Sequence, residues 1–141
     1  MGVEVSKLTF YTSAGRVALN MWDLAGDDKL GGLRDGYLLN ADGVIYMYDV
    51  TDSSSYDAIP DWIKLNGRIN ENIPAVIAGT KVDLPNKAVS KPTLGKKHSL
   101  QLYEISSLSN FNFEKPFLFL IRRLLADPDI EFVEAPALYM E

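Results

Sequence analysis

Residues 43–50 read GVIYMYDV, a continuous run of β-branched and aromatic residues. Such a run predicts a strand that is covered on both faces, as strands of parallel sheets are. A second short apolar run, PAVIAG, occupies residues 74–79. Between the two runs, residues 53–70 carry apolar side chains at helical spacing, with serines placed to cap the helix start. This stretch therefore predicts two strands joined by a helix, the unit from which parallel sheets are built.

The flanking segments extend the pattern. Residues 3–11 alternate weakly and predict a strand with one wet face, and the turn residues at 12–16 lead into a return strand at 17–24. Residues 100–106 predict a further strand, and residues 113–126 predict a helix that ends before Pro128. Residues 84–92 are typical of a loop. The sequence thus predicts an α/β domain with a mainly parallel sheet and an antiparallel hairpin at its start.

Composition narrows the class of protein. The 141 residues suffice for one domain, and a hydrophobic content of 47% with 23% charged residues is ordinary for a globular protein. No apolar run has the length needed to cross a bilayer, and a net charge of −5 argues against nucleic acid as the main partner. Cysteine is absent and His98 is the single histidine, which excludes thiolate and multi-histidine metal centres. We therefore expect neither a nucleic-acid nor a membrane partner.

Polar residues follow several of the predicted strands. Ligands of open α/β sheets bind beyond the carboxyl ends of the strands. At those ends stand Asp23, the group Thr80, Lys81 and Asp83, and the pair Ser106 and Ser107. Any one of these alone would be read as a cap or a turn residue. The ordered set favours a binding site instead.

Each of these groups has a chemical use. Asp23 can hold a water of a magnesium ion beside phosphates, and the amide of Gly26 can approach a terminal phosphate closely. Asp83 offers two acceptors to a ring N–H and an exocyclic amine, which guanine presents together. The stem of Lys81 can lie along the face of a base, and an amide near Ser107 can donate to a carbonyl oxygen. The pattern favours a guanine nucleotide.

Longer phrases carry a family resemblance. They are WDLAG, KLGGLRDGY, DVTDSSSY, TKVD, YEISSLSNFNFEKPF and DPDIEFVEAPAL, in this order from about residue 2 to residue 138. The chain resembles the Ras-like small GTPases and, among them, the Ran subfamily. The resemblance implies a P-loop-type G domain with a three-layer open sheet, GTP or GDP with magnesium as cofactors, a role in nucleocytoplasmic transport, and a location in nucleus and cytoplasm.

The resemblance also assigns roles to residues. The nucleotide-binding positions it implies are Asp23, Gly26, Thr80, Lys81, Asp83, Ser106, Ser107 and Leu108, with Asp23 meeting magnesium through water. Three of the motif positions depart from the family pattern: Asp27 replaces the glutamine that orients water, Thr80 replaces asparagine, and Leu108 replaces lysine. A carboxylate at position 27 repels phosphate and cannot donate an N–H, so we expect hydrolysis to suffer and no residue to be catalytic.

A phosphate loop is not found in the 141 residues. Gly26 with Gly31, and Gly31 with Gly36, have its spacing, but neither pair is followed by Lys-Ser/Thr. In the resembled family this loop, the central first strand, the first helix and the first switch precede the segment matched by residues 1–5. We therefore expect residues 1–141 to form a single truncated Ran-like G domain without that strand and helix. Either another chain supplies the strand, through a partner or a dimer, or residues 17–24 and 43–50 pair directly.

The resemblance further implies contacts with partners. Arg34 and Asp35 lie where the second switch of Ran meets the exchange factor and nuclear transport receptors. Leu30 stands in place of an aromatic anchor for a transport factor. Lys96 and Lys97 match a shortened basic patch, expected here on a loop. For these charged residues a solvated surface is the competing interpretation.

Several functional hypotheses remain open at this point. The chain is a degenerate Ran-like nucleotide-binding domain without autonomous GTPase activity, or an active GTPase whose first segment is supplied separately. It is alternatively a pseudo-GTPase that serves as a structural subunit. Apart from the family, Asp23, Asp49 and Asp83 near strand ends also suit a receiver domain with an acidic pocket, although the initial hairpin and TKVD argue against it.

Overall fold

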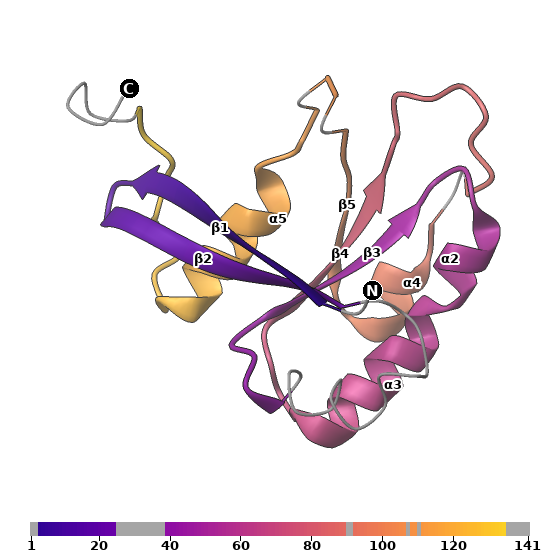
Figure 1. The fold of residues 1–141 in the computed structure, drawn as a ribbon, viewed down its shortest axis with the longest axis horizontal. Helices are drawn as coiled ribbons and strands as arrows, with labels where there is room; N and C mark the ends of the chain where they lie inside the picture. Colours follow the sequence, from indigo (N-terminus) through magenta and orange to yellow (C-terminus); the bar gives the residue numbers. More distant parts are fainter. Residues whose placement is uncertain (1–2, 25–38, 90–91, 107, 110, 135–141) are drawn as a thin grey trace.

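The structure is a computed structural model of the chain and describes residues 3–24, 39–89, 92–106, 108–109 and 111–134. Its elements in chain order are β1 (Val3–Thr12), β2 (Gly15–Leu24), β3 (Val44–Asp49), α2 (Ser53–Asp57), α3 (Ile59–Ile69), β4 (Ala75–Thr80), α4 (Leu94–His98), β5 (Gln101–Glu104) and α5 (Lys115–Leu124) (Figure 1). This order confirms the predicted hairpin followed by alternating strands and helices.

The strands form two separate sheets. β3, β4 and β5 form a parallel sheet with β4 in the centre, and β1 and β2 form an antiparallel pair. Tyr46, Tyr48 and Ile77 direct their side chains to one face, where they form a cluster with residues of α2, α3 and α4. Residues alternate between faces along a strand, so Val76 and Ala78 face the other side, where α5 packs on β4. The parallel sheet is thus the middle layer of three.

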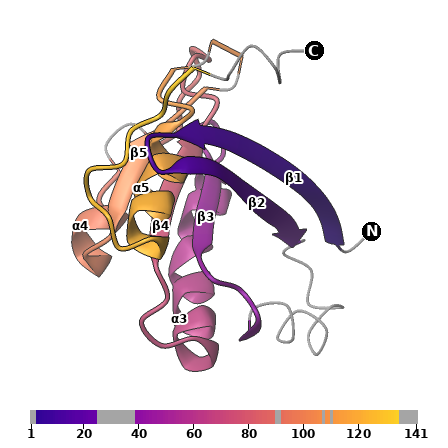
Figure 2. The same cartoon turned by 90° about the vertical axis from the view of Figure 1, so that its left-hand side faces the viewer.

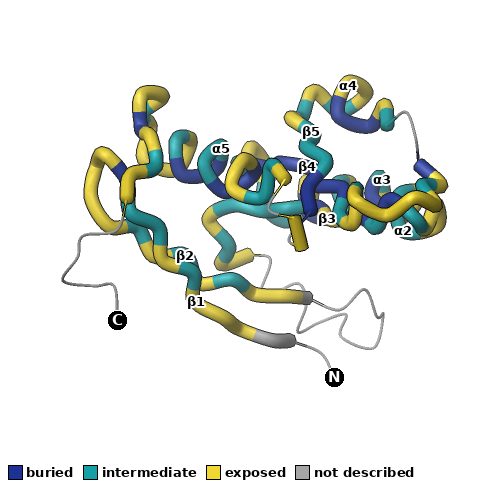
Figure 3. Tube along the Cα trace, turned by 90° about the horizontal axis from the view of Figure 1, so that it is seen from above, coloured by how far each residue is buried: buried dark blue, intermediate teal, exposed yellow. Residues whose placement is uncertain are grey.

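The core follows the parallel sheet rather than the hairpin. Burial is concentrated along β4, whose residues from Ala75 to Gly79 are all buried, whereas the hairpin is intermediate or exposed along most of its length (Figure 3). Ile77, Val76 and Ile121 of α5 are fully buried. Short apolar runs in β3 and β4 therefore form the centre of the core, and residues of the helices pack on them from both sides.

The hairpin is anchored at its turn. The ring of Phe10 lies 5.3 Å from that of Phe117 in α5 and 5.2 Å from that of Phe132. Residues 130–133 also bond to the turn, since Ser13 N donates to Glu131 O at 2.9 Å. At the opposite end of the hairpin the paired residues Val5 and Trp22 are about half exposed. In Figure 2 the hairpin accordingly stands away from β3 towards its free end.

Direct pairing of residues 17–24 with 43–50 was one predicted outcome, and it is wrong: β2 and β3 belong to different sheets. The physical reason is that the hairpin packs through Phe10 onto α5 and the 130–133 segment. The outer edge of β3 has no strand neighbour in the described part of the chain. Val44 N donates to Pro74 O and Val50 N to Thr80 O, so even-numbered residues of β3 direct their backbone groups to β4. Ile45 and Met47 direct theirs to the open edge.

Two helix predictions need correction. Residues 53–70 form two helices, α2 and α3, which meet at Ala58. Pro60 stands at the second position of α3, where its missing N–H costs nothing but a continuous helix through Ala58 would lose a bond. The lysines predicted on a loop belong to α4, whose five residues are too few to show helical periodicity. None of the described helices has the length and apolarity to span a bilayer.

Two glycines test this account of the core. A Cβ on Gly79 would lie 2.5 Å from the Cζ and hydroxyl oxygen of Tyr48, whereas a Cβ on Gly67 of α3 would meet nothing within 4 Å. We expect Gly79→Ala to lower the free energy of unfolding by about 1–3 kcal/mol, because Tyr48 must move. Gly67→Ala should raise it by roughly 0.5–1 kcal/mol, as alanine does in a helix. Denaturant titration of both variants measures this, and equal effects would contradict the packing of Tyr48 on Gly79.

Candidate functional site

The candidate site lies where β3, β4 and β5 end. Asp49 and Thr80 are register partners at the ends of β3 and β4. Backbone bonds continue past the strands: Val82 N donates to Ile105 O at 3.3 Å, and Ile105 N donates to Gly79 O at 2.7 Å. The loops after β4 and β5 are therefore fixed next to each other. This brings the predicted groups on those two loops together.

Asp83 is held by a buried hydroxyl. Ser106 Oγ donates to Asp83 Oδ1 at 2.6 Å and accepts from Ser109 N at 3.2 Å. Ser106 is 1% exposed, and its own N–H donates to Phe111 O. The serine therefore orients the carboxylate while Asp83 itself stays exposed. Within the described residues no partner is found for Asp83 Oδ2, so this oxygen is free to accept from a ligand.

Lys81 forms an ion pair with Asp49. Its Nζ lies 2.8 Å from Asp49 Oδ2, while Asp49 Oδ1 accepts from Thr51 N at 2.8 Å and from Thr51 Oγ1 at 2.6 Å. Hydrogen bonds from Lys81 and Thr51 lower the pKa of Asp49 to about 2, and the same hydrogen bond to Asp49 raises the pKa of Lys81. Lys81 also has a φ of 63°, in the left-handed region that non-glycine residues seldom adopt. The lysine is thus directed across the sheet edge towards β3.

Thr80 acts within the sheet. Its Oγ1 donates to Tyr48 O at 3.1 Å, and Thr80 O accepts from Val50 N. Its side chain therefore joins the ends of β3 and β4. Asp49 N donates to Ser55 Oγ at 2.9 Å, which attaches the start of α2 to the same edge. The sequence interpretation did not assign roles to Asp49 as a lysine partner, Thr51 or Ser55, because only the fold brings positions 49 and 81 together.

Other predicted site residues are not part of this cluster. Asp23 lies exposed at the end of β2, which Figures 1 and 2 show well away from the ends of β3 and β4. Leu108 is 85% exposed. Lys96 and Lys97 are exposed on α4, which leads into the amino end of β5, opposite to the cluster. Those outside the described residues are Gly26, Asp27, Leu30, Arg34, Asp35 and Ser107.

The donor set is suited to an organic ligand. No group of three acidic or histidine side chains that could hold a metal is present among the residues that the structure describes. What the cluster offers is a fixed carboxylate and a lysine. An exposed carboxylate with one free oxygen is suited to accept from the N–H groups of a heterocyclic base. The aliphatic stem of Lys81 can cover the face of such a base.

The ion pair gives a pH-dependent prediction. Because the folded pKa of Asp49, about 2, lies below the ordinary value of 3.8, its contribution to stability is present above pH 3.8 and is lost as the pH falls through about 2. Carboxyl-detected NMR titration should find this lowered pKa in the native chain and a value closer to 3.8 in Lys81→Met. An unchanged pKa in Lys81→Met would contradict the assigned ion pair.

A comparison with protein-family models finds one match that covers this site. Residues 1–126 match the model described as the Ras family, which includes the hairpin, the parallel sheet and all of the residues of the cluster. The match spans well over half of the chain, and the parallel order of β3, β4 and β5 agrees with a Ras-like G domain. The chain therefore belongs to the Ras family, whose members are GTP-binding proteins.

Proposed function

We propose that this chain is a Ran-type guanine-nucleotide-binding protein of nucleocytoplasmic transport that lacks autonomous GTPase activity. The observation that carries the nucleotide-binding part is the Asp83 carboxylate, fixed by buried Ser106 beside Lys81 at the carboxyl edge of the sheet. A guanine base needs two acceptors and an apolar cover for its face: Asp83 Oδ2 would accept one N–H, Asp83 Oδ1 would accept the second on the lone pair that Ser106 Oγ does not use, and the stem of Lys81 would cover the ring.

The guanine base would be held by Asp83 and covered by the stem of Lys81. Asp83 accepts from the ring N–H and the exocyclic amine, whereas adenine has no such pair of donors on that edge. Lys81 Nζ already has the Asp49 carboxylate as a partner. The stem of Lys81 would cover the base either with this ion pair kept or after it has been broken. The nucleotide supplies the phosphates on which a switch acts, and magnesium neutralises part of their charge.

Two features of the 141 residues lead us to expect weak GTP hydrolysis. A phosphate loop with its lysine would cradle the phosphates and hold magnesium, and the 141 residues contain no such motif. Asp27 occupies the position of the water-orienting glutamine, and Asp23 is the remaining residue suited to a magnesium-bound water. Binding of GTP or GDP with magnesium is therefore expected to be weak unless another segment completes the phosphate side.

The open edge of β3 supports completion by an added strand. The backbone groups of Ile45 and Met47 point outwards along this edge, and the side chain of Met47 is 55% exposed. Parallel strands are normally covered on both faces and have neighbours on both sides, so the open edge favours a further strand beside β3 and the exposed Met47 favours a further element over this face. A strand and phosphate loop supplied by another segment or a partner would make an active GTPase. Without one, the domain would act as a pseudo-GTPase subunit.

The transport role rests on the Ran-like phrases. GGLRDGY contains Arg34 and Asp35, the expected contacts for exchange factor and transport receptors, and NFNFEKPF leads into α5. Exposed Lys96 and Lys97 on α4 suit an acidic receptor surface. We infer a location in nucleus and cytoplasm on the same basis.

A pull-down from an extract tests this part of the proposal. We expect the chain to bind nuclear transport receptors, Arg34→Ala to lose this binding, and Arg68→Ala to retain it.

Fluorescent GDP titration tests nucleotide binding directly. We expect binding with magnesium that Asp83→Ala weakens about tenfold or more, because hydrogen bonds to a charged group are lost. Asp57→Ala, an exposed carboxylate of α2, is the matched control and should change nothing. An ATP analogue should not compete. Absence of GDP binding at high micromolar concentration would overturn nucleotide binding by the chain alone and favour the pseudo-GTPase.

A further inference from the structure

The two side chains that would receive a base lie in one turn and are fixed from opposite sides. Lys81 and Asp83 belong to the turn after β4, which Leu84 N closes by donating to Lys81 O at 3.0 Å. Asp83 is bonded on the side of β5, through the Ser106 hydroxyl. Lys81 extends the other way and bonds to Asp49 at the end of β3. The positions of the two side chains therefore depend on different neighbours.

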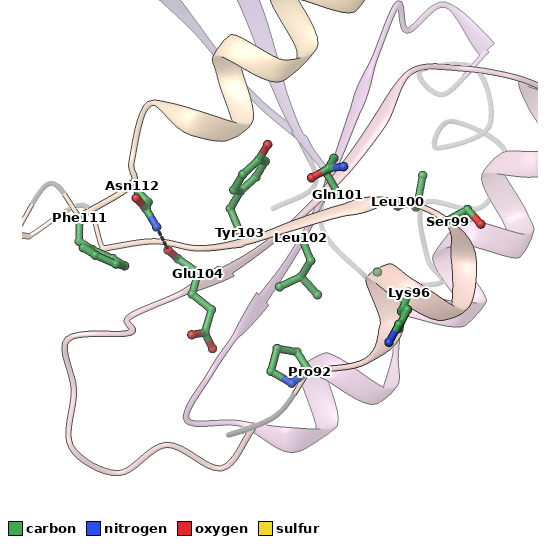
Figure 4. A pocket seen from close by; sticks show the side chains of 11 residues that line it. Pro92, Lys96, Ser99, Leu100, Gln101, Leu102, Tyr103, Glu104, Phe111 and Asn112 are labelled. Carbon is green, nitrogen blue, oxygen red and sulfur yellow. Dashed lines mark hydrogen bonds between the residues drawn. The ribbon is translucent and has the colours of Figure 1, made fainter.

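The β5 side of the site is held by the loop that follows that strand. Ser106 N donates to Phe111 O at 3.0 Å, and Asn112 Nδ2 donates to Glu104 O at 3.3 Å (Figure 4). These bonds close the loop on β5 and keep the Ser106 hydroxyl 2.6 Å from Asp83 Oδ1. The carboxylate that would accept from the edge of a base is thus fixed by the protein alone.

The β3 side of the site is held by the Asp49 carboxylate. Asp49 Oδ1 accepts from Thr51 N at 2.8 Å and from Thr51 Oγ1 at 2.6 Å, while Asp49 Oδ2 accepts from Lys81 Nζ at 2.8 Å. The backbone of Asp49 is fixed as well, because Asp49 N donates to Ser55 Oγ at 2.9 Å. Asp49 therefore presents one oxygen to the lysine from a fixed position.

The bond to Asp49 fixes the far end of an otherwise exposed lysine. The side chain of Lys81 is 58% exposed, and an exposed ion pair adds little to the stability of a fold. An unbonded lysine on a surface loses conformational entropy when a ligand orders it. With Nζ on β3 and the backbone in the turn after β4, the aliphatic stem already extends along the carboxyl edge of the sheet. It is a preformed apolar cover for one face of a base.

We propose that Asp49 is a positioning residue of the nucleotide site. It keeps its bond to Lys81 when a guanine nucleotide binds, and so holds the lysine stem against the face of the base. This role rests on the proposed nucleotide binding. The two carboxylates then have different tasks: Asp83 accepts from the edge of the base, whereas Asp49 acts on its face through Lys81 and does not touch the nucleotide.

Titrations with GDP and with inosine diphosphate test this division. Hypoxanthine has the ring N–H of guanine but lacks its exocyclic amine, so Asp83→Ala should reduce the preference for GDP. We expect Asp49→Asn to weaken both nucleotides about fivefold and to leave their ratio unchanged, because Lys81 must then be ordered on binding. Asp52→Asn is the matched control and should change neither affinity, since the Asp52 carboxylate bonds to Ser54 instead.

Lys81→Met separates positioning from a structural effect of Asp49. Methionine keeps an apolar side chain but has no Nζ to bond to Asp49. In the Lys81→Met background, Asp49→Asn should therefore have no further effect on the affinity for GDP. If Asp49 served only to shape the end of β3 through Thr51, its substitution would weaken GDP binding equally in both backgrounds.

The outcomes separate this role from nucleotide binding itself. Tighter GDP binding by Asp49→Asn would overturn the role, because the ion pair would then have to break when a base enters. Unchanged GDP binding by Asp49→Asn, an altered ratio of GDP to inosine diphosphate, or equal weakening with and without Lys81 would also overturn it. Each of these results leaves nucleotide binding intact. A native chain that binds neither nucleotide at high micromolar concentration would overturn nucleotide binding by the chain alone, and this role with it.

Discussion

The contact between Tyr48 and Gly79 is the constraint on which the rest of the structure depends. The ring and hydroxyl of Tyr48 occupy the space where any other residue at position 79 would carry a Cβ. The ring also packs edge-on against Tyr56 at 4.8 Å, and the Tyr56 hydroxyl accepts from Thr93 N and Leu94 N. One buried side chain on β3 therefore fixes β4 and, through Tyr56, the start of α4. Desolvation by burial raises the pKa of Tyr48, so its hydroxyl stays neutral.

The same contact sets the geometry of both ends of the sheet. Gly79 O accepts from Ile105 N, which places Ser106 and thereby the Asp83 carboxylate. At the other end, α4 presents Gly95 to the backbone of β5, and a Cβ there would lie 2.8 Å from Leu100 O. Close approach of α4 also brings Gly95 O within 2.8 Å of Leu100 N, which donates to it. The candidate nucleotide site and the β5 edge are thus two consequences of one packing arrangement.

Much of this could be predicted from the sequence, and the exceptions have physical causes. Residues 43–50 and 74–79 were identified as buried parallel strands because a run of β-branched and aromatic residues is informative without any long-range contact. The sequence predicts that Asp83 and Ser106 belong to one site, but only the fold shows the hydrogen bond between them. The sequence does not predict the ion pair of Lys81 with Asp49, since this contact depends on a register between strands separated by two helices. Helical periodicity of apolar residues likewise does not reveal α4, because its five residues make little more than one turn.

The two open edges differ in how strictly they select a partner. On β3, the outward groups of Ile45 and Met47 have no partner within the part of the chain that the structure describes, so several registers of an added strand satisfy them. Specificity there must come from side chains, such as exposed Met47. On β5, the chain's own residues already lie against both ends of the strand, since Leu100 N donates to Gly95 O and Glu104 O accepts from Asn112 Nδ2. Because an unpaired buried group costs more than a hydrogen bond gains, the partly covered β5 edge accepts an added strand less readily than the β3 edge.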